Sequence, residues 1–232
     1  METVVDLVET VTVPAGEALI APDVTHGADF LRESIYRTGN FLRHCGVHEG
    51  AAVRLIDVRE PETVFALLGS GLLGASVSFE PDGRTEPSAL IGPTARLGSV
   101  STPTGCTRVA FGEQPEDPSW AHFDAVVWSE NPFFPETDIA GSCPFLARGE
   151  VSQRVALGAA ETVAEQLSPE DIVAVRAPLS TPGTVIAGIL APLVAGASIL
   201  LPDGDTNGTV AVAESSGVPE QRRLDPEEVE IP

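Results

Sequence analysis

The sequence contains no lysine, so all 13 of its basic side chains are arginines. This excludes mechanisms that need a lysine amine from the chain itself, such as a Schiff base or the lysine contact of a P-loop enzyme. Against the arginines stand 34 Asp and Glu, which gives a formal net charge of −21 over 232 residues. Because so negative a surface repels phosphates, nucleic acid and anionic membranes are excluded as expected partners.

Aromatic side chains and cysteines are also scarce. Aromatics make up 5% of the chain and hydrophobic residues 43%, so aliphatic side chains must fill the core, which favours α/β layers over a β-sandwich. The cysteines, Cys45, Cys106 and Cys143, are odd in number and widely spaced, which indicates reduced thiols. The N-terminus is acidic, unlike a signal peptide, and glycine and proline interrupt the apolar stretch 184–201. We therefore expect a cytoplasmic protein without a membrane span.

The excess of acid opposes folding through charge repulsion unless salt screens it. At 1 M salt the Debye length falls to roughly 3 Å, and such repulsion largely disappears. The acidity and the complete use of arginine in place of lysine together predict a halophilic protein of haloarchaeal type. An ordinary acidic protein is the alternative interpretation.

The hydrophobic pattern predicts two αβαβ units separated by an irregular region. In the first unit we expect a helix from Phe30 to Cys45, a strand at 52–58, a helix at 61–74 and a strand at 75–79. In the second we expect a helix at 156–167, a strand at 172–177, a helix at 180–196 and a strand at 197–201. The predicted segments are 1–25 (irregular, with a strand at 10–13), 26–82 (first unit), 83–150 (connector with short strands at 107–111 and 124–128), 151–214 (second unit) and 215–232 (an acidic tail, either an edge strand or frayed).

The two units share a local pattern. LLGSGLLGASVSFEP (67–81) and ILAPLVAGASILLP (189–202) each contain an apolar helix, Gly-Ala-Ser, a short strand and a closing proline. The preceding strands are nearly continuous apolar runs, typical of parallel strands buried on both faces. This repetition predicts an internal duplication in which each unit is a right-handed βαβ crossover preceded by a helix.

These segments resemble the N-terminal part of the acyl-CoA synthetase (AMP-dependent synthetase/ligase) superfamily. FLRESIYRTGNFLRHCGVHEGAAVRLIDVREPETVFALLGSGLLGASVSFEP (30–81) is similar to that family's opening helix, strand, apolar helix and "AGA-x-x-x-P" strand. LSPEDIVAVRAPLSTPGTVIAGILAPLVAGASILLP (167–202) is similar to the stretch after the family's phosphate loop. The resemblance implies an α/β fold of two related αβ subdomains with largely parallel strands.

The sequence departs from the family where the chemistry should be. A phosphate loop of the form TSGTTGxPKG should lie between the units, but residues 138–161 read DIAGSCPFLARGEVSQRVALGAAE, without a hydroxyl-rich glycine loop or a lysine. The family's adenylating lysine is absent as well. We therefore expect no catalytic residue, and predict a non-catalytic relative that binds a small ligand or another protein, alone or as a homo- or hetero-oligomer. The alternative is a subunit of a split acyl-activating enzyme.

One loop matches the spacing of a calcium-binding loop. Asp203, Asp205 and Asn207 supply oxygens at positions 1, 3 and 5, Gly208 stands at the sharp turn, and Glu214 stands at position 12. The flanking segments read as strands, whereas an EF-hand needs helices. The candidate is thus a weak site for calcium or another cation, and the alternative is an acidic loop between strands.

Other motifs carry less specific signals. Residues 69–74 fit GxGxxG but end a helix instead of opening one, so helix packing and a C-cap explain them better than a cofactor. His44, Cys45 and His48 could suggest a metal, but Gly46 separates the two histidines in the helix pattern. The aromatic, proline-rich segment 128–138 is expected either to pack as a plug between the subdomains or to line a groove. Residues 180–183 open a helix, as an N-cap or as an anion site, and no GxSxG motif supports a hydrolase.

Overall fold

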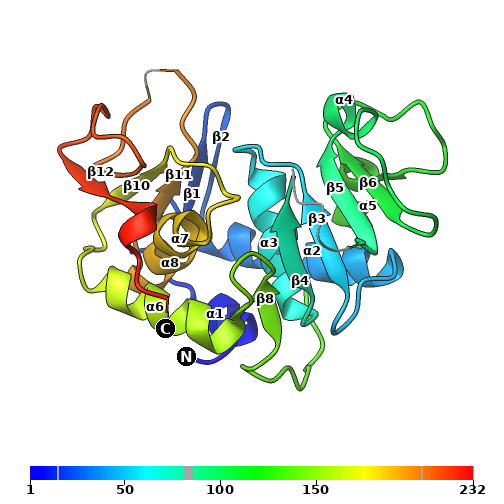
Figure 1. The fold of residues 1–232 in the computed structure, drawn as a ribbon, viewed down its shortest axis with the longest axis horizontal. Helices are drawn as coiled ribbons and strands as arrows, with labels where there is room; N and C mark the ends of the chain where they lie inside the picture. The colour runs from blue at the N-terminus through cyan, green and yellow to red at the C-terminus, as the bar shows by residue number, and fades with distance from the viewer. Residues whose placement is uncertain (15, 81–85, 205, 232) are drawn as a thin grey trace.

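The computed structural model describes residues 1–14, 16–80, 86–204 and 206–231. Two predominantly parallel sheets lie side by side, each accompanied by helices (Figure 1). The first sheet contains, in spatial order, β7 (Ala121–His122), β6 (Thr107–Phe111), β5 (Ala89–Pro93), β3 (Ala52–Leu55), β4 (Ser76–Phe79), β8 (Pro144–Leu146) and β9 (Val151–Ser152). The second contains β13 (Arg222–Leu224), β12 (Val210–Val212), β10 (Ile172–Val175), β11 (Ser198–Leu200), β1 (Leu19–Ala21) and β2 (Val24–His26).

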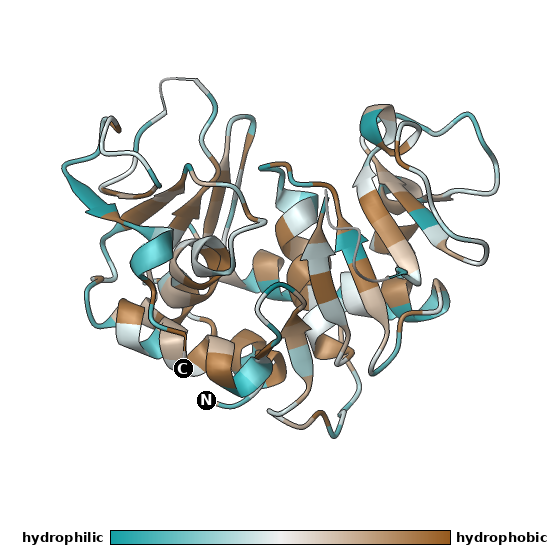
Figure 2. Cartoon of the chain, viewed as in Figure 1, coloured by the Kyte–Doolittle hydropathy of each residue, from teal (hydrophilic) through white to brown (hydrophobic). Residues whose placement is uncertain are grey.

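The helices follow the predicted periodicity in both units. A single cluster of buried side chains runs through both units, and Figure 2 shows hydrophobic residues along the strands and along the helices that pack on them. The helices are α1 (Val4–Thr10), α2 (Ala28–His44), α3 (Pro61–Leu72), α4 (Thr94–Leu97), α5 (Phe123–Val126), η1 (Val127–Ser129), α6 (Gln153–Ala164), α7 (Pro182–Val185), η2 (Ile186–Leu190), α8 (Ala191–Ala195) and η3 (Pro226–Glu228).

The two sheets repeat one topology, as the sequence predicted. In the first sheet the order β6-β5-β3-β4 is parallel throughout, and β13-β12-β10-β11 in the second is its counterpart. Strands β3 and β4 pair from Ala52 with Ser76 to Leu55 with Phe79, and β10 and β11 pair in the same parallel sense. The α/β class and the mainly parallel strands are therefore confirmed.

A hairpin that adjoins each unit in the sequence pairs with the sheet of the other unit, which the sequence did not reveal. The β1–β2 hairpin directly precedes α2 of the first unit, but β1 pairs with β11 in the second sheet. The β8–β9 hairpin directly precedes α6 of the second unit, but β8 pairs with β4 in the first sheet. Because each sheet is completed by the other half of the chain, the two units fold around a shared core.

Buried polar contacts join the halves at the base of these hairpins. Gln153 is completely buried. Its side-chain oxygen accepts a hydrogen bond from the Val4 amide at 2.8 Å, and its side-chain nitrogen donates to the Gly71 carbonyl at 2.8 Å. One side chain therefore satisfies backbone groups of α1 and α3 from the start of α6, as buried polar groups require.

The helix predicted at 180–196 is interrupted by a π-helical turn, η2, between α7 and α8. Pro192 lacks an N–H and its ring would clash with the carbonyl of residue 188, so a regular helix cannot pass through this point. Gly188 lets the helix approach the sheet, because an added Cβ would lie 3.0 Å from the Val175 side chain. Gly196 then ends the helix in the left-handed conformation with a φ of 72°.

Three local predictions need correction. The segment 1–25 holds helix α1 and the β1–β2 hairpin, and the strand expected at 10–13 is absent there. The capping box of Thr3 and Asp6 starts that helix, a local signal that outweighs the β-branched residues after it. The strand expected at 124–128 is helical, formed by α5 and η1. In the tail, the edge-strand interpretation is confirmed, since β13 pairs with β12.

Candidate functional site

The connections that follow equivalent strands of the two units meet at one place. Residues 56–60 connect β3 to α3, and residues 176–181 connect β10 to α7. The carboxylate of Asp57 accepts hydrogen bonds from the amides of Leu179 at 3.2 Å and Ser180 at 3.1 Å. We call this region, where the two connections touch, the junction. Ligands of α/β proteins commonly bind beyond the carboxyl ends of parallel strands, and the junction lies at those ends.

The junction explains the segment predicted at 180–183. Thr181 occupies the N-cap position of α7, but its side chain makes no capping hydrogen bond. The amides before the helix are instead occupied by the Asp57 carboxylate from the other unit. The Asp57 carboxylate thus holds the residues just before the helix, Thr181 takes the N-cap position, and an anion site at the helix start itself stays a prediction.

The arginines divide into three groups by the partner of the guanidinium. Within the described ranges, seven pair with a carboxylate within 4.0 Å, and Arg43 and Arg108 stack on the rings of Phe134 and Trp120. The third group has neither kind of partner and donates to backbone carbonyls. Its members are Arg59, Arg96 and Arg148.

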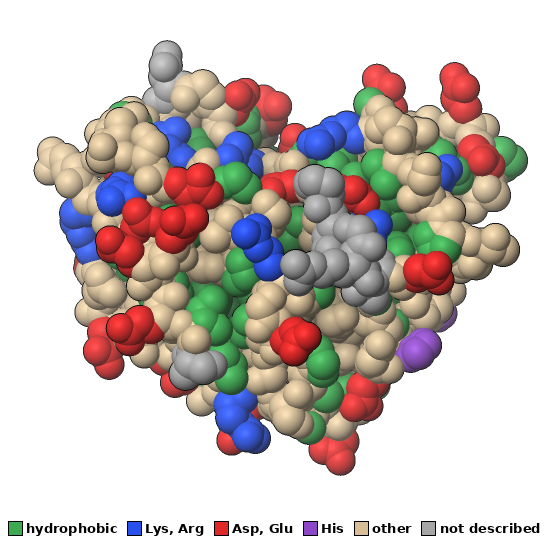
Figure 3. Space-filling view, in the orientation of Figure 1, with side chains coloured by type: hydrophobic (Ala, Val, Ile, Leu, Met, Phe, Trp, Pro, Cys, Tyr) green, Lys and Arg blue, Asp and Glu red, His purple; other side chains and the backbone are tan. Residues whose placement is uncertain are grey.

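All three arginines of the third group lie at the junction. Arg96 Nη1 donates to the Asp57 carbonyl at 3.1 Å, and Arg148 Nη1 donates to the Ser180 carbonyl at 3.0 Å. Arg59 Nη2 donates to the carbonyl of Arg176. All three side chains are exposed. Because the chain has no lysine, every blue side chain in Figure 3 is an arginine.

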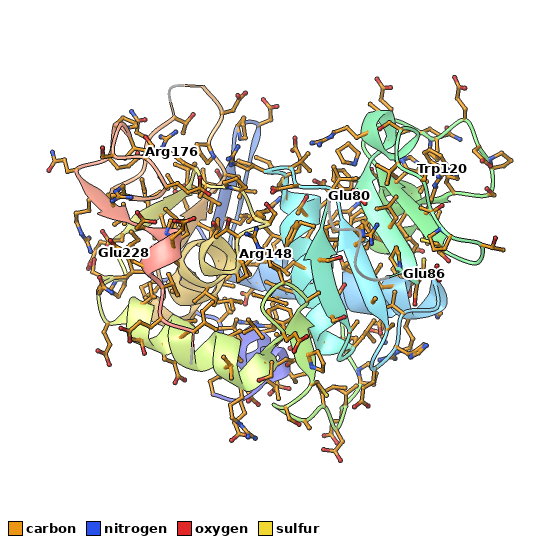
Figure 4. All side chains as sticks on the ribbon, viewed as in Figure 1. Glu80, Glu86, Trp120, Arg148, Arg176 and Glu228 are labelled. Atoms are coloured by element: carbon orange, nitrogen blue, oxygen red, sulfur yellow. The ribbon has the colours of Figure 1, made fainter. Side chains whose placement is uncertain are left out.

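A tight turn stands where the family resemblance implies a phosphate loop. Strands β8 and β9 are joined by residues 147–150, closed by a hydrogen bond from the Glu150 amide to the Ala147 carbonyl at 3.2 Å. Both Gly149 and Glu150 have positive φ, at 84° and 55°. Arg148 projects from this turn toward the second sheet (Figure 4). The turn has no row of free amides and hydroxyls with which to enclose a triphosphate.

Carboxylates near the start of α3 lie beside this basic group. Burial raises the pKa of Glu60, and repulsion from Asp203 and Asp23 raises it further. Burial also raises the pKa of Glu62, which a hydrogen bond to its own backbone opposes and repulsion from Asp124 reinforces. The junction thus combines exposed arginines with carboxyl groups whose pKa is raised above its ordinary value.

A buried ion pair stabilises the loops above β10. The guanidinium of Arg176 contacts both carboxylate oxygens of Glu220 at 2.6–3.0 Å, and it also donates to the Thr206 carbonyl and to Asn207 Oδ1. The Glu220 side chain has no exposed surface. It accepts a third hydrogen bond from the Gly208 amide at 3.1 Å. The loop between β11 and β12 is thereby anchored to β10.

The cation-loop hypothesis concerns that same anchored loop. Its flanking elements are strands β11 and β12, as the sequence indicated. The side-chain oxygen of Asn207 accepts from Arg176 at 3.1 Å, and Asp203 and Glu214 are exposed. Asp205 lies outside the described residues. In the part of the chain that the structure describes, no three His, Cys, Asp or Glu side chains gather as a metal site, and calcium binding stays a prediction.

The histidine and cysteine candidates are not brought together. Nδ1 of His44 lies 2.9 Å from Glu130 Oε1, whereas Nδ1 of His48 faces the backbone carbonyl of Glu49. Burial raises the pKa of the Cys45 thiol to about 11, and Glu130 contributes to this shift. A thiol so rarely ionised at neutral pH is a poor nucleophile and a poor metal ligand.

The glycines of GxGxxG serve packing, as predicted. A Cβ on Gly69 would lie 3.0 Å from Thr38 Cγ2, and a Cβ on Gly71 would lie 2.8 Å from Val4 Cγ2. Gly74 follows the helix with a φ of 67°. The small residues therefore allow α2 and α1 to approach α3, and Gly74 turns the chain into β4.

The segment 128–138 packs along α2, so the expectation that it is a plug between the subdomains is wrong. Asn40 donates to the carbonyls of Asn131 and Phe133 at 3.0 Å each, and the Phe134 ring stacks near Tyr36. Phe133 remains 75% exposed. A surface groove of about 390 Å³ lies between this segment and α2, so the groove-lining alternative is the one that the geometry supports.

Sequence reasoning missed the arginine group of the junction. Arg59, Arg96 and Arg148 are far apart in the chain, and no spacing links them. The sequence offers only an indirect signal, which is the presence of arginines in a strongly acidic chain. Across the described residues, no helix has the length and hydropathy to cross a membrane.

Several solved structures have a similar fold. The anthranilate CoA ligase AuaEII in complex with anthranoyl-AMP matches with a TM-score of 0.76 and 16% identity over 91% of this chain and 49% of its own. The benzoate CoA ligase from Burkholderia xenovorans LB400 matches with a TM-score of 0.73 and 17% identity over 91% and 50%. MatB from Rhodopseudomonas palustris matches with a TM-score of 0.75 and 14% identity over 91% and 48%.

These matches establish the fold of the chain. It is the fold found in about half of each of these ligases, with two mainly parallel sheets. The chain spans about half the length of the ligases that it matches. No family model matches the sequence, and no curated protein does.

Proposed function

We propose that this chain is a non-adenylating relative of the acyl-CoA synthetases that binds a small ligand at the junction of its two units. The observation that carries the proposal is the turn at residues 147–150. A four-residue turn with an exposed arginine takes the place of the glycine- and hydroxyl-rich loop that the family resemblance implies. The chain also has no lysine to stabilise the negative charge that develops in adenylation.

The fold supports ligand binding at the junction. Parallel strands of both sheets present their connections at one junction, which is a common place for ligands in α/β proteins. Function resides in a site and not in a fold, so the matched ligases do not carry their reaction over to this chain. The acidic, lysine-free composition supports a halophilic, haloarchaeal protein of the cytoplasm as part of the same proposal.

A second candidate is a subunit of a split acyl-activating enzyme. The chain matches about half of each of these ligases, and in this candidate a separate chain supplies the region of the ligases that it does not match. Native mass spectrometry of the protein from its own host in high salt distinguishes the two, since a split enzyme is isolated with its partner chain.

The test of the proposal is ATP–pyrophosphate exchange with acetate, benzoate and other short acids. We expect no exchange above that of a preparation lacking the protein, at low and at molar KCl. Exchange that copurifies with the chain alone would overturn the proposal, and exchange that appears only with a partner would favour the split enzyme.

A further inference from the structure

We propose that Arg59, Arg96 and Arg148 form a binding site for a small organic oxyanion that carries at least two anionic groups, either carboxylates or phosphates. This inference rests on the proposed function and names the chemistry of its ligand. It begins from the distribution of arginine partners. In a chain with 34 acidic residues and 13 arginines, carboxylate partners are abundant. The lack of such a partner at an arginine therefore reflects where the fold places that arginine.

The three arginines are positioned by neutral acceptors. Each donates from one terminal nitrogen to a backbone carbonyl, on Arg176, Asp57 and Ser180 respectively. A guanidinium carries five N–H donors in a fixed plane. One contact orients the plane, and the other donors stay available to a carboxylate or phosphate, which guanidinium binds in a bidentate manner.

The carboxylate of Asp57 is not paired with any of the three arginines. The Asp57 carboxylate is turned toward the Leu179 and Ser180 amides, and only its carbonyl contacts Arg96. Burial, and then repulsion from Asp203 and Asp23, raises the pKa of Glu60, and no ion pair joins Glu60 to an arginine among the described residues. Within the described residues, three guanidinium groups therefore stand at the junction without an ion-pair partner, which favours the binding of an anion there.

The number of anionic groups follows from the elements involved. Arg59 lies in the connection after β3, Arg96 in α4, and Arg148 in the β8–β9 turn. The three guanidinium groups thus come from three separate elements around the junction, and each can hold one oxyanion in a bidentate manner. A di- or tricarboxylate or a phosphate ester with a second anionic group meets this arrangement.

The test is calorimetric titration of the whole chain with citrate and, separately, with inorganic pyrophosphate, at constant ionic strength. The two probes distinguish carboxylates from phosphates as the source of the charge. We expect saturable binding of at least one of them. Each of R59Q, R96Q and R148Q should weaken it about tenfold, the effect of losing one hydrogen bond to a charged group.

R43Q is the matched control, since Arg43 also has no carboxylate partner among the described residues but stacks on Phe134 away from the junction. Its affinity for the probe should equal that of the original chain. Equal loss in R43Q, or no binding of either probe, would overturn the site.

A second measurement needs no variant and so does not depend on variants that fold. Phenylglyoxal modifies accessible arginines, and peptide mass spectrometry locates the products. Citrate or pyrophosphate should protect Arg59, Arg96 and Arg148 and leave Arg154 reactive. Failure of this inference is distinguishable from failure of the proposed function. A neutral ligand that binds without protecting the three arginines from phenylglyoxal would refute only the anion site. ATP–pyrophosphate exchange would refute the proposed function.

Discussion

Replacing Glu220 with glutamine tests how strongly the buried ion pair holds the second sheet. The Glu220 side chain is wholly buried and Arg176 is 18% exposed, with contacts of 2.6–3.0 Å between them. Breaking a buried pair on one side costs about 3–5 kcal/mol, because the remaining charge is left without its counterion. Glutamine keeps an acceptor for Arg176 and for Gly208, so we expect about 3 kcal/mol less unfolding free energy, a large part of the 5–15 kcal/mol typical of a domain.

The same pair predicts a pH dependence. Burial alone would raise the pKa of Glu220, but hydrogen bonds from Arg176 and Gly208 outweigh it and lower the pKa below its ordinary value of 4.5. A carboxyl group with a lowered folded-state pKa stabilises the fold above its unfolded pKa. This stabilisation is lost as the pH falls through the folded-state pKa. The original chain should therefore lose stability below pH 4.5, and E220Q should lose less over the same range.

The assay is urea unfolding followed by circular dichroism in molar KCl, at pH 7 and at steps down to pH 3. E2Q is the matched control, because the Glu2–Arg154 pair is exposed at 63% and 57% and exposed pairs contribute at most about 1 kcal/mol. If E220Q unfolds at the same urea concentration as E2Q, or keeps the acid sensitivity of the original chain, the account of the buried pair is wrong.

Three further outcomes can be checked. The melting temperature should rise between low and molar KCl because salt screens a net charge of −21; a melting temperature independent of salt would contradict the halophile interpretation. Gly183→Ala should cost about 1–3 kcal/mol in urea unfolding, since its Cβ would lie 1.8 Å from the Pro226 carbonyl oxygen, whereas Gly158→Ala, with open space around it, should stabilise α6; equal effects would refute this packing. In an NMR titration, His26 should show a pKa below 6.5 because burial disfavours its charged form, so protonation as the pH falls below 6.5 opposes folding. Phe30→Ala removes the ring stacked 4.3 Å from His26 and should move the His26 pKa back toward 6.5. An unchanged pKa in this variant would exclude burial under Phe30 as the cause.

The sequence by itself determined the elements whose signals are local. Helices α2, α3 and α6 follow apolar stripes with a period near 3.6, and strands β3 and β10 are apolar runs that only a doubly covered sheet can bury. The repeated Gly-Ala-Ser after each crossover helix disclosed the duplication. Composition alone disclosed the absence of lysine and hence of lysine chemistry. The helix and strand signals are each contained in one short window, and the repeat and the composition are read from the sequence directly, so none of them needed a contact between distant residues.

Only the tertiary structure decided the exchange of hairpins and the candidate site. Which sheet edge the β1–β2 or β8–β9 hairpin joins depends on the order of strands, which no local pattern records. The apolar run at 124–128 is too short to distinguish a strand from a helix by its pattern, and in the structure this segment is helical. Arg59, Arg96 and Arg148 became neighbours of one junction because parallel strands bring the connections at their carboxyl ends to the same edge. Because the three arginines are far apart in the sequence, their arrangement at the junction could not be predicted without the order of the strands in the two sheets.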